Sequence, residues 1–521
     1  MTPVRRPTTV DPVSAAGSRV TRAAVLGVVL FTLFAVPSCA RRDDSGPAPV
    51  TTGSPAPQLP HPLPTAPAPN VATVGDIPSI SQVVNDAIAA PRLPGAVVQI
   101  GHDGKVVLRR AFGERKLAGE PGLDGEPAAA EPMTVDTIFD LASLTKILGT
   151  ATAVLQLYEQ GRVHIDDPVQ TYLPGFNATG DPVRARVTLR MLLTHTSGIG
   201  GDLSHQGPWG LTAPDKADGI HRALTAPLEF APGELFHYSD IGFIILGTLV
   251  EQLTGQPLDE YVQQHVFAPL QMTDTRYLPA AKVCGPHRIR GTAVGFDKDE
   301  AAVADCPEDS WSTDLLARIA PTARDEDTPG INPDFDDLLR GTVHDPTARR
   351  MGGVAGSAGV FSTAADVGKY LQALLDRLAG RPSPFPLQQA TLELMTTPQQ
   401  PGHFPGQVAL ANAATRAAIA AGGRGSDPLL APSYPAVAGV NLRGFGWDID
   451  TPHSRPRGMV FPIGSFGHTG FTGVTMWVDP GTDTYVVVLA NVIHQRGGPP
   501  ITGLSGDIAT LAGRALHLYG S

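Results

Sequence analysis

A serine and a lysine one helical turn apart are the residues of this sequence best suited to chemistry. Ser143 and Lys146 lie in the run Phe139-Asp-Leu-Ala-Ser-Leu-Thr-Lys-Ile-Leu-Gly. Helix residues three positions apart project from one face, so the amine can reach the hydroxyl. A serine becomes nucleophilic when a neighbour accepts its proton, and a lysine does so if desolvation keeps its amine neutral. We therefore expect nucleophilic catalysis; the alternative is a capping serine and a lysine extending to solvent.

The segment after Lys146 must hold this pair in place, and its pattern predicts a buried α-helix. Apolar side chains recur at the 3.6-residue helical period, and Gly161 is expected to end the helix. The residues of this stripe are Ile147, Leu148, Ala151, Val154, Leu155 and Tyr158.

Length, composition and charge limit the classes of protein that the chain can belong to. Its 521 residues are 42% hydrophobic, which is enough for one large or two medium domains with a substantial core. The net charge of −11 and the absence of a basic cluster make nucleic acid an unexpected partner.

The first 38 residues predict a signal peptide of the lipoprotein type. Four arginines precede an apolar run of 14 residues, Ala23 to Val36, which is short for a membrane span, since a span needs about 20. Val36-Pro-Ser-Cys39 resembles a bacterial lipobox, so Cys39 is expected to carry lipid. The alternatives are a plain signal peptide, and hence a secreted protein, or an uncleaved anchor. In each case we expect the rest of the chain to be exported, and with lipid on Cys39 to lie on the outer face of the membrane.

Residues 39–75 predict a tether and residues 76–521 a folded domain. The tether is rich in Pro, Ala, Ser and Thr, which favours extended conformations and cannot form a core. In the folded part, Asp-Gly at 103–104 and Asp-Pro-Gly at 479–481 each separate two β-rich runs and predict hairpins. Helices are expected over 79–90, 189–194, 241–253 and 364–378, and an inserted, partly disordered loop over 396–440. Strands near both ends, with helices between, predict one antiparallel sheet formed by the two termini.

Two further polar sets have structural alternatives. His195 and Ser197 could suggest a serine–histidine pair, but Ser and Thr beside Gly198 usually form turns. Tyr238 and Asp240 precede the helix over 241–253, so the simple interpretation is a packed aromatic residue and an N-cap.

Three motifs in chain order carry a family resemblance: Ser143-x-x-Lys146, Tyr238-Ser239-Asp240 and His468-Thr469-Gly470. They resemble the Ser-x-x-Lys, Tyr-x-Asn and Lys/His-Thr-Gly signatures of the class C β-lactamase and penicillin-binding protein superfamily. Leu193-Thr-His-Thr-Ser-Gly, Gly341-Thr-Val-His-Asp and the glycine-rich run 352–363 also look like segments of exported β-lactamase-related serine hydrolases. The resemblance extends from about residue 79 to the end.

The resemblance implies an α/β fold, an antiparallel sheet flanked by helices beside an all-helical subdomain, with the site between them. It implies that Ser143 forms an acyl-enzyme while Lys146 and Tyr238 move protons. His468 would support Tyr238 or contact a substrate carboxylate, Thr469 and Gly470 would line the substrate site, and the N–H groups of Ser143 and Phe471 would form an oxyanion hole. No metal or cofactor is implied.

Two departures from the family pattern affect the expected substrate. Asp240 replaces an Asn whose amide can donate a hydrogen bond, whereas an ionised carboxylate only accepts. His468 replaces a Lys, which weakens attraction for a carboxylate at pH 7. We expect an exported esterase or peptidase acting on a small-molecule, ester or peptide substrate of the cell envelope. A weak β-lactamase and an inactive lipoprotein that binds cell-wall material are the alternatives.

Cys284 and Cys306 remain once Cys39 is assigned to lipid. They form an even pair, 22 residues apart, in a protein expected to be exported to an oxidising compartment. We therefore expect a disulfide; two separate buried thiols are the alternative.

Overall fold

The computed structural model describes residues 63–64, 72–300, 306–420, 441–495 and 501–521. The predicted signal peptide, Cys39 and all but a few residues of the predicted tether lie outside these ranges. In the described part of the chain, no helix is both long and apolar enough to cross a membrane.

An antiparallel sheet of eight strands joins the two ends of the folded chain, in the order β11-β12-β13-β14-β15-β1-β2-β3. At its centre β1 pairs with β15, from Ala96 opposite Ala490 to His102 opposite Thr484. The prediction that N- and C-terminal strands share one sheet is confirmed. The strands are β1 Gly95–His102, β2 Lys105–Lys116, β3 Glu131–Pro132, β11 Leu442–Arg443, β12 Asp448–Asp450, β13 Phe466–Gly470, β14 Val474–Asp479 and β15 Thr484–Ala490.

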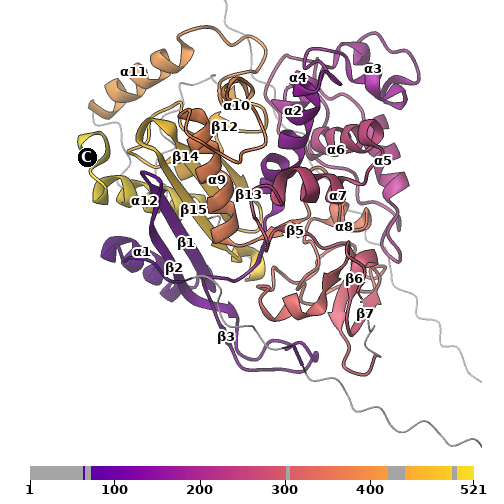
Figure 1. Cartoon of the computed structure of the whole chain (residues 1–521). Coiled ribbons are helices and arrows are strands. Elements are labelled where there is room, and N and C mark those ends of the chain that lie inside the picture. Colours follow the sequence, from indigo (N-terminus) through magenta and orange to yellow (C-terminus); the bar gives the residue numbers. More distant parts are fainter. Residues whose placement is uncertain (1–62, 65–71, 301–305, 421–440, 496–500) are drawn as a thin grey trace, which may run out of the picture. The chain divides into compact units, whose positions relative to one another are not determined.

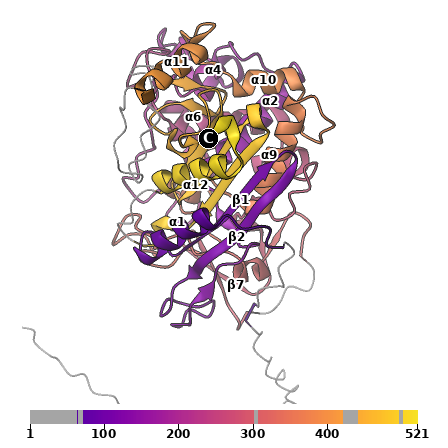
Figure 2. The same cartoon turned by 90° about the vertical axis from the view of Figure 1, so that its left-hand side faces the viewer.

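Helices cover both faces of this sheet because its central strands are apolar on both sides. Val98 of β1 packs in the same cluster as Ile80 of α1 (Pro78–Ala89) and Ile508 of α12 (Thr502–Ala515). Val97, the next residue along β1, points to the opposite face, in the cluster that contains Leu371 of α9 (Ala364–Leu378). Figure 1 shows α9 lying across the sheet, and Figure 2 shows α1 and α12 side by side on it. The predicted antiparallel sheet flanked by helices is confirmed.

A second region, between β3 and α9 in sequence, is mostly helical. Its helices are α2 Thr152–Glu159, α3 Val169–Tyr172, α4 Leu189–Leu193, α5 Lys216–Thr225, α6 Asp240–Thr254, α7 Leu258–Val262 and α8 Pro346–Arg350. It is not purely helical, because short strands also form there: β4 Phe139–Asp140, β5 Arg276–Tyr277 and β10 Val360–Ser362 in one sheet, β6 Val283–Cys284 with β9 Trp311–Ser312, and β7 His287–Arg290 with β8 Ala293–Phe296.

The predicted disulfide joins strand β6 to the segment before β9. Cys284 lies on β6 and is joined to Cys306 by a disulfide, with the two Cα atoms 5.8 Å apart. The crosslink closes a loop in a region that also packs on the main core through Val294, Phe296 and Trp311.

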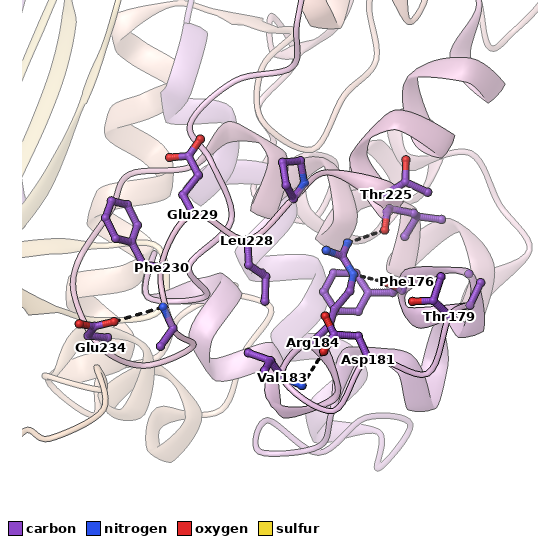
Figure 3. A pocket seen from close by; sticks show the side chains of 15 residues that line it. Phe176, Thr179, Asp181, Val183, Arg184, Thr225, Leu228, Glu229, Phe230 and Glu234 are labelled. Carbon is purple, nitrogen blue, oxygen red and sulfur yellow. Dashed lines mark hydrogen bonds between the residues drawn. The ribbon is translucent and has the colours of Figure 1, made fainter.

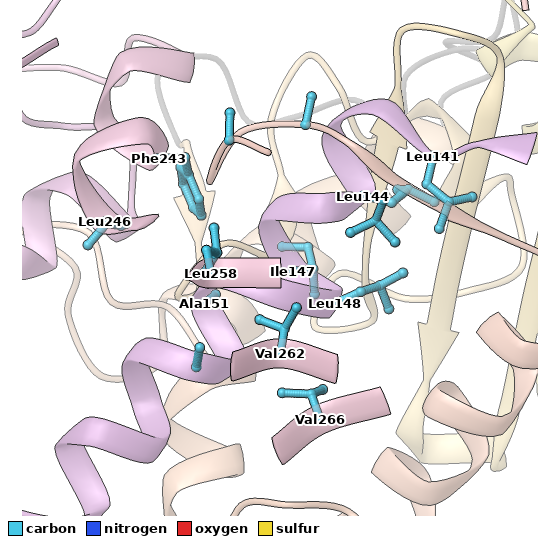
Figure 4. Packing of buried hydrophobic residues seen from close by; sticks show 14 of the residues in the cluster. Leu141, Leu144, Ile147, Leu148, Ala151, Phe243, Leu246, Leu258, Val262 and Val266 are labelled. Carbon is cyan, nitrogen blue, oxygen red and sulfur yellow. The ribbon is translucent and has the colours of Figure 1, made fainter. Parts of the chain in front are cut away.

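The segment that carries Ser143 differs from the regular α-helix expected from its apolar stripe. Residues Ala142–Leu144 form a 3₁₀ turn, Lys146–Ala151 form a π-helix, and a regular α-helix begins only at Thr152. Figure 4 shows Ile147, Leu148 and Ala151 packed against apolar side chains that include Phe243 and Val262. Short π-helical stretches occur frequently at functional sites.

Within the expected loop over 396–440, the described residues, up to 420, are more regular than expected. Helices α10 (Gln389–Thr396) and α11 (Gln407–Ala420) lie at its start and within it. The alanine-rich run of α11 has high helix propensity, which the expectation of a loop did not take into account. Residues 421–440 lie outside the described part.

Candidate active site

A tight turn between β4 and the π-helix presents Ser143. Ala142, just before the serine, has a backbone φ of 45°, in the left-handed region that a residue with a Cβ rarely adopts. The buried Asp140 carboxylate holds this turn, accepting the N–H of Ala142 at 2.9 Å and the N–H of His344 at 2.7 Å. Burial, the largest effect, raises the pKa of Asp140 to about 6.

Lys146 is fully buried, and several acceptors surround its ammonium group. Its Nζ lies 2.9 Å from Ser143 Oγ and 2.9 Å from the Ser357 carbonyl oxygen, and it also contacts Asp240 Oδ1. Burial on its own would lower the pKa of Lys146, but the adjacent Asp240 carboxylate outweighs it and raises that pKa. The expectation of a lysine kept neutral by desolvation is therefore wrong for the free protein.

The glycine-rich run 352–363 supplies one of these acceptors. It passes so close to α6 that a Cβ at Gly356 would lie 2.0 Å from the Phe243 carbonyl oxygen. Thr150 Oγ1 donates to the Gly356 carbonyl at 2.8 Å, and the next carbonyl, that of Ser357, faces Lys146. The glycine is required by this close approach, which brings a backbone oxygen to the amine.

Tyr238 completes the group around Ser143. Hydrogen bonds from Ser143 and Lys146 to its phenolic oxygen favour the ionised form, but burial is the larger effect and raises the pKa of Tyr238. The N-cap of α6 is Ser239, whose Oγ accepts the N–H of Gly242, and not Asp240 as the structural alternative assumed. Asp240, as the first helical residue, can therefore turn its carboxylate to Lys146.

His195 supports this site from behind and does not form a serine–histidine pair. Its ring stacks on that of Tyr238 with centroids 4.3 Å apart, and its Nδ1 accepts the N–H of Ser239 at 3.0 Å. Ser197 Oγ accepts the N–H of Ile199, as a turn-forming serine does. The structural interpretation of this motif agrees with its geometry.

Two further carboxyl groups lie near Asp240. Asp202 lines the same cavity, where partial loss of hydration, followed by the charge of Asp240, raises the pKa of Asp202 to about 7. Asp345, the N-cap of α8, has a pKa of about 6, raised by burial and then by Asp240. Among the described residues, no group of three or more His, Cys, Asp or Glu side chains is arranged to hold a metal ion.

Strand β13 brings the third motif to the opposite side of Ser143. Gly470 approaches the serine turn so closely that a Cβ there would lie 2.8 Å from the Leu141 carbonyl oxygen. His468 is buried, and its Nδ1 donates to the Thr469 carbonyl at 2.8 Å. Burial lowers the pKa of His468 well below its usual value, and the nearby Arg443 lowers it further, so the ring is neutral. The Phe471 ring is 75% exposed and stacks on His344.

These motifs meet at one cavity of about 460 Å³. The residues proposed from the sequence that line it are Ser143, Tyr238, Asp240, His468, Thr469, Gly470 and Phe471. A larger hollow of about 750 Å³ lies near α5, lined by Phe176, Leu228 and Phe230 among others (Figure 3). Its one arginine, Arg184, donates to backbone carbonyls, and it contains none of the three motifs, so we assign the chemistry to the smaller cavity.

Sequence reasoning missed Asp140, Asp202 and the Ser357 carbonyl. Asp140 lies three residues before Ser143, and a short acidic side chain this close to a predicted nucleophile is the signal that could have identified it. Asp202 follows Gly200-Gly201 in an otherwise unremarked loop, and a backbone carbonyl such as that of Ser357 has no side-chain signal at all.

Comparisons with known proteins agree with this geometry. The family model described as "Beta-lactamase" matches residues 80–499. A protein of Escherichia coli strain K12, provisionally named D-alanyl-D-alanine carboxypeptidase, is 29% identical over 414 residues, covering 78% of this chain and 80% of the relative. An N-acetylmuramyl-L-alanine amidase of Bacillus subtilis strain 168 is 30% identical over 423 residues, 80% of each chain.

Solved structures show the same fold at lower identity. Simvastatin synthase (LovD) from Aspergillus terreus superposes with a TM-score of 0.56 at 24% identity, over 85% of this chain and 98% of that one. EstCE1, a hydrolase with promiscuous acyltransferase activity, gives 0.52 at 21% identity, over 83% and 97%. The family model matches most of the folded chain, and the structure brings a serine, a lysine and a tyrosine together at one site. The chain therefore belongs to the β-lactamase family of serine hydrolases.

Proposed function

We propose that this chain is an exported serine hydrolase that forms an acyl-enzyme through Ser143 and cleaves an ester-type substrate of the cell envelope. The observation that carries the proposal is the contact of Ser143 Oγ with Lys146 Nζ at 2.9 Å, with the Tyr238 phenol bonded to both. A hydroxyl placed between two proton-transferring groups is the arrangement that nucleophilic catalysis requires.

In this mechanism Ser143 Oγ attacks the substrate carbonyl and expels the alcohol or amine, and water then releases the acyl group. Lys146 and Tyr238 transfer the protons. The N–H groups of Ser143 and Phe471 stabilise the oxyanion, which typically contributes about 3 to 4 kcal/mol per donor. Support for this pairing comes from β13, whose last residue, Gly470, packs against the turn that carries Ser143.

The charges at the cavity favour an ester over a peptide with a free terminal carboxylate. His468 is neutral, so it offers no charge to a carboxylate. The two Nη atoms of Arg443 are already engaged, one donating to the Gly446 carbonyl at 2.7 Å and the other 3.7 Å from Asp448. Asp240 and Asp448 also line the cavity, and carboxylates at these positions repel an anionic group.

A peptidase is the second candidate function, favoured by the names of the relatives. Two of them are named for cleavage at D-alanyl-D-alanine and at N-acetylmuramyl-L-alanine.

Location at the envelope, with Cys39 lipidated at the outer face of the membrane, is supported by the apolar run 23–36 and the lipobox-like segment that follows it.

A panel of acyl donors tests the proposal. We would measure turnover of p-nitrophenyl esters, release of D-alanine from a D-alanyl-D-alanine peptide, and labelling by a fluorescent penicillin, with Ser143→Ala as control. We expect ester turnover that disappears in the variant. Peptide cleavage without ester turnover would favour the second candidate. No Ser143-dependent reaction with any of the three would contradict both and favour an inactive, wall-binding lipoprotein.

A further inference from the structure

We propose that Asp240 and Asp202 form the proton-accepting end of a relay that begins at Ser143 and passes through Lys146. Asp240 is thereby a catalytic base at the position where the family has an amide, and Asp202 is a positioning residue that controls its basicity. The inference rests on the proposed acyl-enzyme function and adds the route of the proton.

The contacts of Lys146 show why a further acceptor is needed. An ammonium group has three protons, and here four groups surround it: Ser143 Oγ, the Ser357 carbonyl oxygen, the Asp240 carboxylate and the Tyr238 phenol. It cannot take the serine proton until it has released one of its own. A carbonyl oxygen is too weak a base to receive that proton, and burial raises the pKa of Tyr238, so its phenol stays protonated and cannot receive it either. The carboxylate of Asp240 is therefore the acceptor.

Backbone hydrogen bonds hold the loop between α4 and α5 against the start of α6, so that Asp202 lies near Asp240. The Gly201 carbonyl accepts the N–H of Asp240 at 2.8 Å, and the Gly200 carbonyl accepts the Ser239 hydroxyl at 2.7 Å. Both carboxyl groups line the same cavity, and the charge of Asp240 favours the protonated form of Asp202.

Solvent exposure increases along this row of groups. The Lys146 side chain is 0% exposed and that of Asp240 is 20% exposed, while Asp202 is exposed at the cavity. A proton that reaches the two carboxyl groups can therefore exchange with bulk water, which the buried amine cannot do directly.

The step balances as follows. Lys146 gives one proton to Asp240 Oδ1, Ser143 Oγ then bonds to the substrate carbonyl carbon, and the serine proton moves to the neutral Lys146 amine. When the bond to the leaving group breaks, the leaving alcohol takes a proton from Lys146, and Asp240 returns its proton to the amine. The resting ion pair is restored, and water follows the same route in deacylation.

Ionisation of Asp202 should make this relay faster. The charged or titratable groups that face Asp202 are Asp240, Asp345 and Lys146, and Tyr238 faces Lys146 and Asp240. Protonated Asp202 donates to Asp240 and stabilises its charge. Once it loses that proton, near pH 7, the donor is lost and a second negative charge faces Asp240, so Asp240 takes the lysine proton more readily.

A double-mutant cycle on the rate of Ser143 labelling by a fluorophosphonate tests the relay. Fluoride leaves without needing a proton, so the rate reports formation of the nucleophile. From pH 5.5 to 8.5 we expect the labelling rate of the wild type to rise, with a midpoint near pH 7. The rate of Asp202→Asn should not change over this range and should be about 10-fold or more below the wild type at pH 8, since one pKa unit of coupling is a factor of ten. The exposed Glu308→Gln is the matched control.

Asp240→Asn removes the acceptor, so adding Asp202→Asn to it should change the rate less than about 2-fold at every pH. The same effect of Asp202→Asn in both backgrounds, or a flat wild-type profile between pH 6 and 8, would overturn the relay while Ser143 labelling still supported the acyl-enzyme. Absence of any Ser143 labelling in the wild type would instead overturn the proposed function. Melting temperatures identify any variant that fails to fold.

Discussion

The Asp140 carboxylate gives a quantitative test of how the serine turn is held. It is 2% exposed and bonds to two backbone N–H groups, one in the turn and one at His344. At pH 4 Asp140 is a neutral acid, and both of its oxygens can still accept an N–H. Asp140→Asn keeps the shape but leaves one acceptor oxygen for two donors, and an unsatisfied buried N–H costs about 1 to 3 kcal/mol. The variant should therefore be less stable than the wild type at pH 4.

The difference should change sharply with pH. The pKa of Asp140 is raised from 3.8 to about 6 by burial, so the folded state holds its proton more tightly than the unfolded state. Stability that is present below about pH 4 is then lost as the pH rises to 6, by about 3 kcal/mol for two pKa units. The asparagine variant does not titrate, so its deficit at pH 4 should vanish or reverse at pH 7.

Urea unfolding of both proteins at pH 4, 5, 6 and 7 measures this difference, and subtraction cancels the carboxyl groups that the two proteins share. Glu308→Gln, at an exposed position, is the control. A difference between variant and wild type that stays constant within about 1 kcal/mol over this range would refute the assignment of a buried carboxyl group with a raised pKa at Asp140.

Three other substitutions or treatments have definite expected outcomes. Tyr238→Phe keeps the ring that stacks on His195, so the melting temperature should barely move while the rate of ester acylation falls about 100-fold or more; an unchanged rate would return Tyr238 to a packing role. Reduction of the Cys284–Cys306 disulfide should lower the free energy of unfolding by roughly 3 kcal/mol, and alkylation of both thiols without reductant, followed by intact mass, would show that no bridge exists. His468→Lys should improve kcat/KM for a carboxylate-bearing acyl donor relative to a neutral ester, and an equal change for both would count against the charge argument.

Local features of the sequence were enough to point to the Ser143–Lys146 pair and to predict the sheet. The three-residue spacing of Ser143 and Lys146 and the β-rich runs at both ends of the chain are short-range features that a sequence displays directly. The helix over 364–378 has the predicted bounds because its apolar face and its N-capping Thr363 both lie in the local sequence.

The features that the sequence could not supply arise from contacts between distant segments. Lys146 and Asp240 are 94 residues apart, and their ion pair reverses the direction of the pKa shift expected from burial. The π-helix over Lys146–Ala151 was missed because its apolar residues also satisfy an ordinary α-helical period. Asp202 is positioned by backbone hydrogen bonds from α6 to the Gly201 carbonyl. Backbone contacts of this kind leave no pattern in the sequence of side chains.

Covalent labelling with a fluorophosphonate, followed by peptide mapping, tests the central claim most directly. We expect one adduct per chain, on the peptide that contains Ser143, with labelling abolished in Ser143→Ala and slowed by several orders of magnitude in Lys146→Ala, because that variant lacks the amine 2.9 Å from the hydroxyl. An adduct on any other residue, or undiminished labelling of either variant, would contradict the assignment of Ser143 as the nucleophile.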